Sequence, residues 1–188
     1  MPSPNDIRKG TVISRDGGLY VVVEFQRVSP GKGGSFVRTR MKSLSTGKVK
    51  EENFKASENM EFAEVLNKNM QFIFSDATGH TFMDGVTYEQ VAIDNDVVGD
   101  DAKYLKEGLD VVVVVHDGKP IALDLPGKIE YTVEHTEPAV KGDTVSGNVT
   151  KEAKMDNGLI VRVSIFIKIG DVIRVNTQTG EYTERISR

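Results

Sequence analysis

Short segments that alternate apolar and polar residues, separated by glycine-containing turns, make up most of the 188-residue chain. A period of two is typical of β-strands with one buried face. In the first third the pattern predicts two hairpins. One joins strands over 11–14 and 19–28, and the other joins strands over 35–44 and 48–54.

The same alternation continues through the rest of the chain, with a single helix expected over 100–106 because acidic residues begin it and Gly108 follows it. Two further groups of strands are predicted, at 71–75, 81–84, 109–116 and 120–125, and at 129–134, 159–165, 172–176 and 181–186. An acidic, less regular stretch ends the first group and Leu125-Pro126-Gly127 ends the second. We therefore expect an all-β protein of three small barrels or sandwiches, over residues 1–64, 65–127 and 128–188.

Charge is distributed unevenly along the chain. The net charge of the whole chain is −4, yet residues 1–50 hold ten Lys and Arg against three Asp and Glu. Such a split predicts that the N-terminal part contacts a polyanion while the remainder of the chain stays soluble and selective.

Several classes of protein are disfavoured. Without cysteine there is no disulfide, thiolate metal site or cysteine nucleophile, and the three histidines lack metal-type spacing. The longest β-branched run, 111–115, is too short to span a bilayer, and the first residues do not resemble a signal peptide. We expect a soluble cytoplasmic protein with no membrane contact, no metal, no cofactor and no catalytic residues, and hence not an enzyme.

The loop Pro30-Gly31-Lys32-Gly33-Gly34 is the sharpest local feature. Glycines on both sides leave Lys32 as a long cation on a thin finger suited to a narrow crevice. A phosphate-binding P-loop is excluded, because Gln26 and Gly33 stand where that motif needs Gly and Ser or Thr. A hairpin turn with a solvated lysine shows the same pattern, and the residues by themselves leave both interpretations open.

Basic residues surround this loop. The stretch 25–50 holds seven Lys and Arg and no acid, and Arg38, Arg40 and Lys42 recur at a spacing of two, so they project from one face of a strand. Solvated polar faces share this pattern, but the absence of acids favours contact with RNA phosphates. We therefore predict an RNA-backbone site of Arg27, Arg38, Arg40 and Lys42.

The C-terminal third offers weaker candidates. Gly142-Asp143-Thr144 forms a polar turn, and the closing strand carries Tyr182 as a stacking surface and Arg185 as a phosphate or base contact. A polar turn and a closing strand without any function would show the same sequence patterns.

Four ordered segments resemble bacterial translation elongation factor P over the full length of the chain. They are VSPGKGGSFVR at 28–38, AKYLKEG at 102–108, TEPAVKGDT at 136–144 and FIKIGDVIRVNTQTGEY at 166–182. Ser164 and Asn176 depart from the family's usual proline and aspartate.

The resemblance implies an SH3-like N-terminal barrel followed by two OB-type barrels in an L shape. It also implies a factor that binds the 70S ribosome between the peptidyl-tRNA and exit sites. There it stimulates peptide-bond formation at stalled consecutive prolines by positioning the peptidyl-tRNA, especially prolyl-tRNA.

The same resemblance assigns roles to residues. Lys32 points towards the CCA end of the peptidyl-tRNA and, in many members, is extended by a modifying enzyme. The residues matching Gly142, Asp143 and Thr144 lie on the small-subunit side, near the exit-site codon. We expect a monomer.

A general single-stranded RNA-binding protein built from OB-type barrels is the alternative, and an enzyme is a third. The sparse aromatic residues, five Tyr, eight Phe and no Trp, speak against the former. The lack of a catalytic constellation speaks against the latter.

Overall fold

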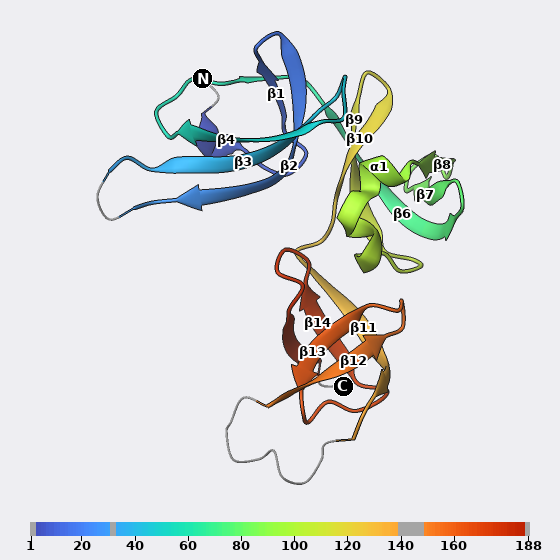
Figure 1. Cartoon of the computed structure of the whole chain (residues 1–188). Coiled ribbons are helices and arrows are strands. Elements are labelled where there is room, and N and C mark those ends of the chain that lie inside the picture. Colours follow the sequence, from blue (N-terminus) through green and yellow to red (C-terminus); the bar gives the residue numbers. More distant parts are fainter. Residues whose placement is uncertain (1–2, 31–32, 139–148, 187–188) are drawn as a thin grey trace.

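The computed structural model describes residues 3–30, 33–138 and 149–186. Three five-stranded antiparallel sheets follow one another along the chain, which confirms the all-β fold class. In Figure 1 the first two modules lie side by side and the third lies below the second, so the second occupies the corner of a bent molecule.

The first module forms a sheet in the order β4-β3-β2-β1-β5. Its elements are η1 (Pro4–Asp6), β1 (Val12–Arg15), β2 (Gly18–Val28), β3 (Phe36–Ser43), β4 (Val49–Lys55) and β5 (Glu61–Phe62). Both predicted hairpins are present, and the alternation of β3 is realised with Val37, Thr39 and Met41 buried.

The second module forms a sheet in the order β10-β9-β6-β7-β8. Its elements are β6 (Leu66–Asp76), β7 (Gly79–Asp84), β8 (Gln90–Ile93), α1 (Asn95–Val98), η2 (Gly99–Tyr104), β9 (Asp110–His116) and β10 (Lys119–Asp124). The helix expected over 100–106 is instead a 3-10 helix that begins at Gly99 and follows one turn of α-helix. Gly99, at φ 57, ends the α-helical turn, and Leu105, at φ −65 and ψ 138, is already extended, so the 3-10 helix ends at Tyr104.

The third module forms a sheet in the order β13-β12-β11-β14-β15. Its strands are β11 (Lys128–Thr136), β12 (Thr150–Met155), β13 (Ile160–Ser164), β14 (Val172–Asn176) and β15 (Tyr182–Ile186). Each module has its own apolar core. The boundaries after residues 64 and 127 stay predictions.

A small apolar cluster joins the first module to the second. Val12 and Val21 pack with Val114 and Ala122, and the backbone at Gly10 approaches so closely that a Cβ there would lie 2.7 Å from the Val114 Cγ2. An ion pair between Lys9 and Asp101 borders this contact.

The joint between the second and third modules is built around η2. Tyr104, at its end, is buried in the core of the third module, and the Tyr131 hydroxyl donates a 2.6 Å hydrogen bond to the Tyr104 carbonyl. The side-chain amide of Asn157 donates to the carbonyls of Lys103 and Leu105, at 3.0 and 3.1 Å. Both joints therefore combine apolar packing with polar contacts that fix an angle.

Candidate nucleic-acid interface

The loop that carries the predicted lysine connects β2 to β3 at the end of the first module that faces away from the second (Figure 1). Gly31 and Lys32 lie outside the described residues. Around them, Pro30, Gly33 and Gly34 are exposed, and Gly33 has φ 110, a conformation that favours glycine. The described flanks of the loop are therefore exposed where β2 ends and β3 begins, and the role of the loop stays a prediction.

The base of the loop is held together by side chains. The hydroxyl oxygens of Ser29 and Ser35 lie 3.1 Å apart, across the two strands. Beside them, an open hollow of about 640 Å³ is lined by residues of β3, of β4 and of the segment after β4, including Phe36, Asn53 and Lys55. A ligand that reached the loop would meet this hollow at its flank.

Arg38 and Arg40 project from the solvent face of β3, as the spacing of two predicts. Within the described part of the chain, Arg38 forms no ion pair and no side-chain hydrogen bond. Its register partners are Gln26 on β2 and Asn53 on β4, so no acid lies directly beside it. Arg38 is thus available to a phosphate.

Strand pairing places two acidic residues beside Arg40, although both are distant from it in the sequence. Glu24 on β2 and Glu51 on β4 are its register partners, and the Glu24 carboxylate lies 3.8 Å from the guanidinium. Because both side chains are largely exposed, the ion pair is weak and readily exchanged for a phosphate. The acid-free stretch 25–50 is therefore not an acid-free surface.

The other two predicted RNA contacts are engaged within the protein. The Lys42 ammonium donates a 2.6 Å hydrogen bond to the Asp96 carbonyl in the second module. The Arg27 guanidinium donates to the carbonyls of Asn5 and Ile7, at 3.0 and 3.3 Å, and lies 5.0 Å from the Phe25 ring centroid. Both cations support the first module and its joint.

In the third module, Gly142, Asp143 and Thr144 lie outside the described residues. Tyr182 is partly buried against the core of its own module, which limits the ring surface left for stacking. Arg185 is exposed, and its guanidinium lies 3.6 Å from the Asp171 carboxylate.

Sequence reasoning missed the residues that set the joints. Tyr104 lies in the segment 102–108 that carries part of the family resemblance, but the sequence assigned no role at a joint to Tyr104, Tyr131, Asn157 or Gly10. Burial raises the pKa of the Tyr131 phenol, with smaller contributions from Tyr104 and Asp156, so the hydroxyl stays protonated as a donor. Only the positions of the modules in space reveal these roles.

Among the described residues, no group of three or more His, Asp or Glu side chains is arranged to hold a metal ion. Within the same residues, no helix has the length and apolar character needed to cross a membrane.

Comparison with known proteins covers the chain from end to end. Residues 3–60 match the Elongation factor P (EF-P) KOW-like domain, residues 65–123 the Elongation factor P (EF-P) OB domain, and residues 129–185 the Elongation factor P C-terminal domain. These descriptions agree with an SH3-like barrel followed by OB-type modules.

Full-length relatives are similar throughout. Elongation factor P of Coprothermobacter proteolyticus is 45% identical over 186 residues, which is 99% of this chain and 100% of that protein. Elongation factor P of Moorella thermoacetica is 43% identical over 185 residues, with 98% and 100% covered.

Among solved structures, eukaryotic translation initiation factor 5A from Methanococcus jannaschii is 18% identical and covers 66% of this chain and 90% of its own, with a TM-score of 0.37. A translation initiation factor eif-5a family protein from Naegleria fowleri is 16% identical, covering 66% and 96%, with a TM-score of 0.33.

Proposed function

We propose, since the chain belongs to the elongation factor P family of translation elongation factors, that it binds the 70S ribosome between the peptidyl-tRNA and exit sites. There it stimulates peptide-bond formation at stalled consecutive prolines by positioning the peptidyl-tRNA. The observation that carries the proposal is the full-length match to elongation factor P, 45% identical over 99% of the chain.

The first module carries the loop that is proposed to contact the peptidyl-tRNA. Its strands β2 and β3 form an arm that extends away from the second module (Figure 1), and Lys32 lies between them in the sequence. In the proposal Lys32 reaches the CCA end of the peptidyl-tRNA, flanked by Pro30, Gly31, Gly33 and Gly34. The small glycines allow the lysine to enter a crowded centre.

Phosphate contacts orient the arm. Arg38 is free among the described residues, and Arg40 can leave its exposed pair with Glu24, so these two arginines are the strongest candidates. Arg27 and Lys42 contribute charge to the same module while their side chains support its structure. Phosphate contacts of this kind position a protein on RNA without reading sequence.

The mechanism is positional rather than chemical, and this chain needs no cofactor or catalytic group for it. The ribosome forms the bond, and the factor restrains the peptidyl-tRNA in a reactive geometry. Holding reactants in an attack geometry contributes on the order of 7–11 kcal/mol in well-oriented model systems. Proline is a rigid and poor substrate, so restraint matters most there.

The two joints serve this mechanism. A restraint can act only if the arm is fixed against a second contact elsewhere on the ribosome. In the proposal the third module supplies that contact on the small-subunit side through Gly142, Asp143, Thr144, Tyr182 and Arg185. The packing of Tyr104 into the third module resists bending between the two ends.

Lys32 is also the proposed target of a lysine-modifying enzyme, which would lengthen its reach. Intact-protein mass spectrometry of the chain from its native host tests this step. A mass above that of the sequence that maps to Lys32 supports it, and an unmodified lysine in active protein rejects it. The factor acts as a monomer in the cytoplasm in this proposal.

Ribosome profiling of a strain that lacks the gene tests the function as a whole. Ribosomes are expected to accumulate at consecutive proline codons and to disperse when the gene is restored. Unchanged occupancy at those codons would contradict the proposal. General binding to free single-stranded RNA, with no proline-specific effect, would favour the alternative function.

A further inference from the structure

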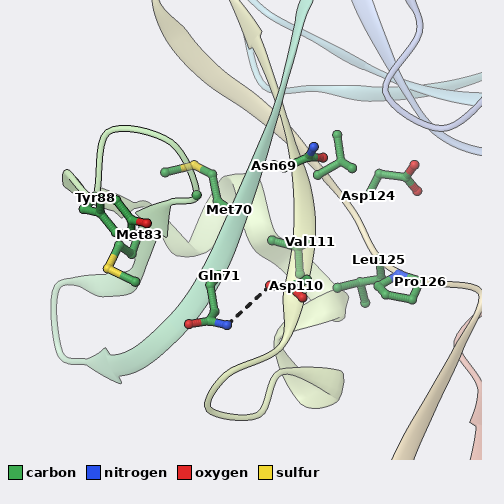
Figure 2. A pocket seen from close by; sticks show the side chains of 12 residues that line it. Asn69, Met70, Gln71, Met83, Tyr88, Asp110, Val111, Asp124, Leu125 and Pro126 are labelled. Atoms are coloured by element: carbon green, nitrogen blue, oxygen red, sulfur yellow. Dashed lines mark hydrogen bonds between the residues drawn. The ribbon is translucent and has the colours of Figure 1, made fainter.

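An open trough of about 680 Å³ crosses the outer face of the second module. Its lining residues come from β6, β7, β9, the turn after β7 and the end of β10. Figure 2 shows Met83 and Tyr88 on one side, Asp124, Leu125 and Pro126 on the other, and Gln71 hydrogen-bonded to Asp110 between them.

Strand register explains why these side chains share a face. Gln71 on β6 pairs with Met83 on β7 and with Asp110 on β9, so the three form one row across the sheet. All three are partly or fully exposed. Their neighbours Met70 and Val111 are buried in the core of the second module, although they also border the trough. The trough is thus an uncovered sheet face with a mixed apolar and acidic surface.

Tyr88 provides an aromatic wall. Its side chain is 71% exposed although tyrosine usually buries most of its ring, and Val86 in the same turn is 83% exposed. The buried Asp84 holds the turn: its carboxylate accepts hydrogen bonds from the backbone N–H of Val86 and Thr87, at 2.8 and 3.1 Å. The ring is therefore presented by a fixed turn.

The charged side chains that line the trough are all acidic. Asp110 and Asp124 lie in its lining, and among the described residues no Lys, Arg or His does. Lys68, a nearby cation on β6, lies 3.8 Å from the Asp84 carboxylate. The whole segment 65–127 holds four Lys and Arg against eleven Asp and Glu, a net charge of −7. Such a surface repels RNA phosphates and attracts cations.

We propose that this trough, lined by Tyr88, Met83, Asp110 and Asp124, docks an extended basic segment of a partner protein that carries arginine and apolar residues. A guanidinium can stack on the Tyr88 ring and pair with a carboxylate, because arginine is planar and weakly hydrated. The partner's apolar side chains cover Met83, Leu125 and Pro126.

This docking site is separate from the loop and from the arginines of β3, so it stands whether or not the proposed function of the first module holds. It assigns the second module a protein partner, whereas the proposed function gives the first module an RNA partner. Charge complementarity selects that partner class over nucleic acid.

Titration of the full chain with a short peptide of repeated Gly-Leu-Arg units, followed by NMR of the backbone amides, tests the proposal. The peptide is expected to shift the amides of Gln71, Met83, Tyr88 and Asp110 at modest salt. A peptide of repeated Gly-Leu-Glu units serves as the control and should leave them unchanged.

Matched variants separate docking from general attraction. Tyr88→Asn keeps a residue that tolerates φ 60, and Asp110→Asn keeps an acceptor for Gln71. Each should weaken binding about threefold to tenfold. Asp117→Asn removes the same charge from an exposed turn outside the trough, and its dissociation constant should match that of the unaltered chain.

Equal weakening by Asp117→Asn and Asp110→Asn would overturn the proposal, because it would show attraction to net charge alone. Shifts spread over all acidic residues, an absence of binding, or displacement of the peptide by single-stranded RNA would overturn it as well.

Discussion

Gly10 illustrates how much a single residue can fix at a joint. Its φ of 83 favours glycine, and an added Cβ would meet Val114 at 2.7 Å. Gly10→Ala should lower the free energy of unfolding by about 1–3 kcal/mol more than Gly17→Ala, because Gly17 has a similar φ of 74 but open space around it. Urea denaturation of both variants measures the difference, and equal losses would show that the close approach costs nothing.

The buried phenol of Tyr131 should make the stability of the protein depend on pH. Tyr131→Phe removes the buried hydrogen bond to the Tyr104 carbonyl and should cost about 1–3 kcal/mol of stability at neutral pH. Burial raises the pKa of Tyr131 above its ordinary value of 10.0, so the unfolded chain loses this proton first. The stability that the phenol contributes is therefore complete below pH 10.0 and is lost as the pH rises further.

Thermal unfolding of the parent chain and of Tyr131→Phe across alkaline pH tests that sign. The gap between their melting temperatures should close as the pH rises above the ordinary phenol pKa. A gap that stays constant would mean that the buried hydroxyl does not titrate with unfolding.

Strand β3 is the element whose side-chain directions were predicted best from the sequence. Its alternation predicted which side chains point outward, and the structure places Arg38 and Arg40 on the solvent face. The acids beside Arg40 could not be predicted from the chain order, because Glu24 and Glu51 reach it only through pairing with β2 and β4.

Replacement of both arginines by glutamine should weaken ribosome binding most at low salt, because each arginine that binds a phosphate releases counterions. The slope of log affinity against log salt should fall by about one for each phosphate that is no longer bound. A decrease in affinity that does not depend on salt would indicate misfolding, which circular dichroism of the variant would reveal.

Elements with weak patterns escaped prediction. β5 has two residues, and the outward positions of β12 are Thr, Glu and Lys while its buried ones, Ala153 and Met155, come late. The helix expected over 100–106 is a 3-10 turn that places Tyr104 in the third module. Short or polar strands depend on their neighbours in space, which periodicity does not describe.

At the scale of the molecule, the uneven distribution of charge along the sequence becomes a difference in net charge between the modules. Residues 1–64 hold eleven Lys and Arg against eight Asp and Glu, whereas residues 65–127 are strongly acidic. We propose that the first module meets RNA, that the second meets a basic protein segment, and that the joints hold them at an angle. The joints are tertiary features, and the sequence did not assign their residues to them.

The measurement closest to the central claim is the rate of peptide-bond formation between consecutive prolines in a reconstituted translation system. The parent chain should accelerate this step and leave a template without prolines almost unchanged. Lys32→Ala should keep the fold and the melting temperature but lose most of the acceleration. A Lys32→Ala rate equal to that of the parent, or an equal effect of the parent on both templates, would contradict the proposed function.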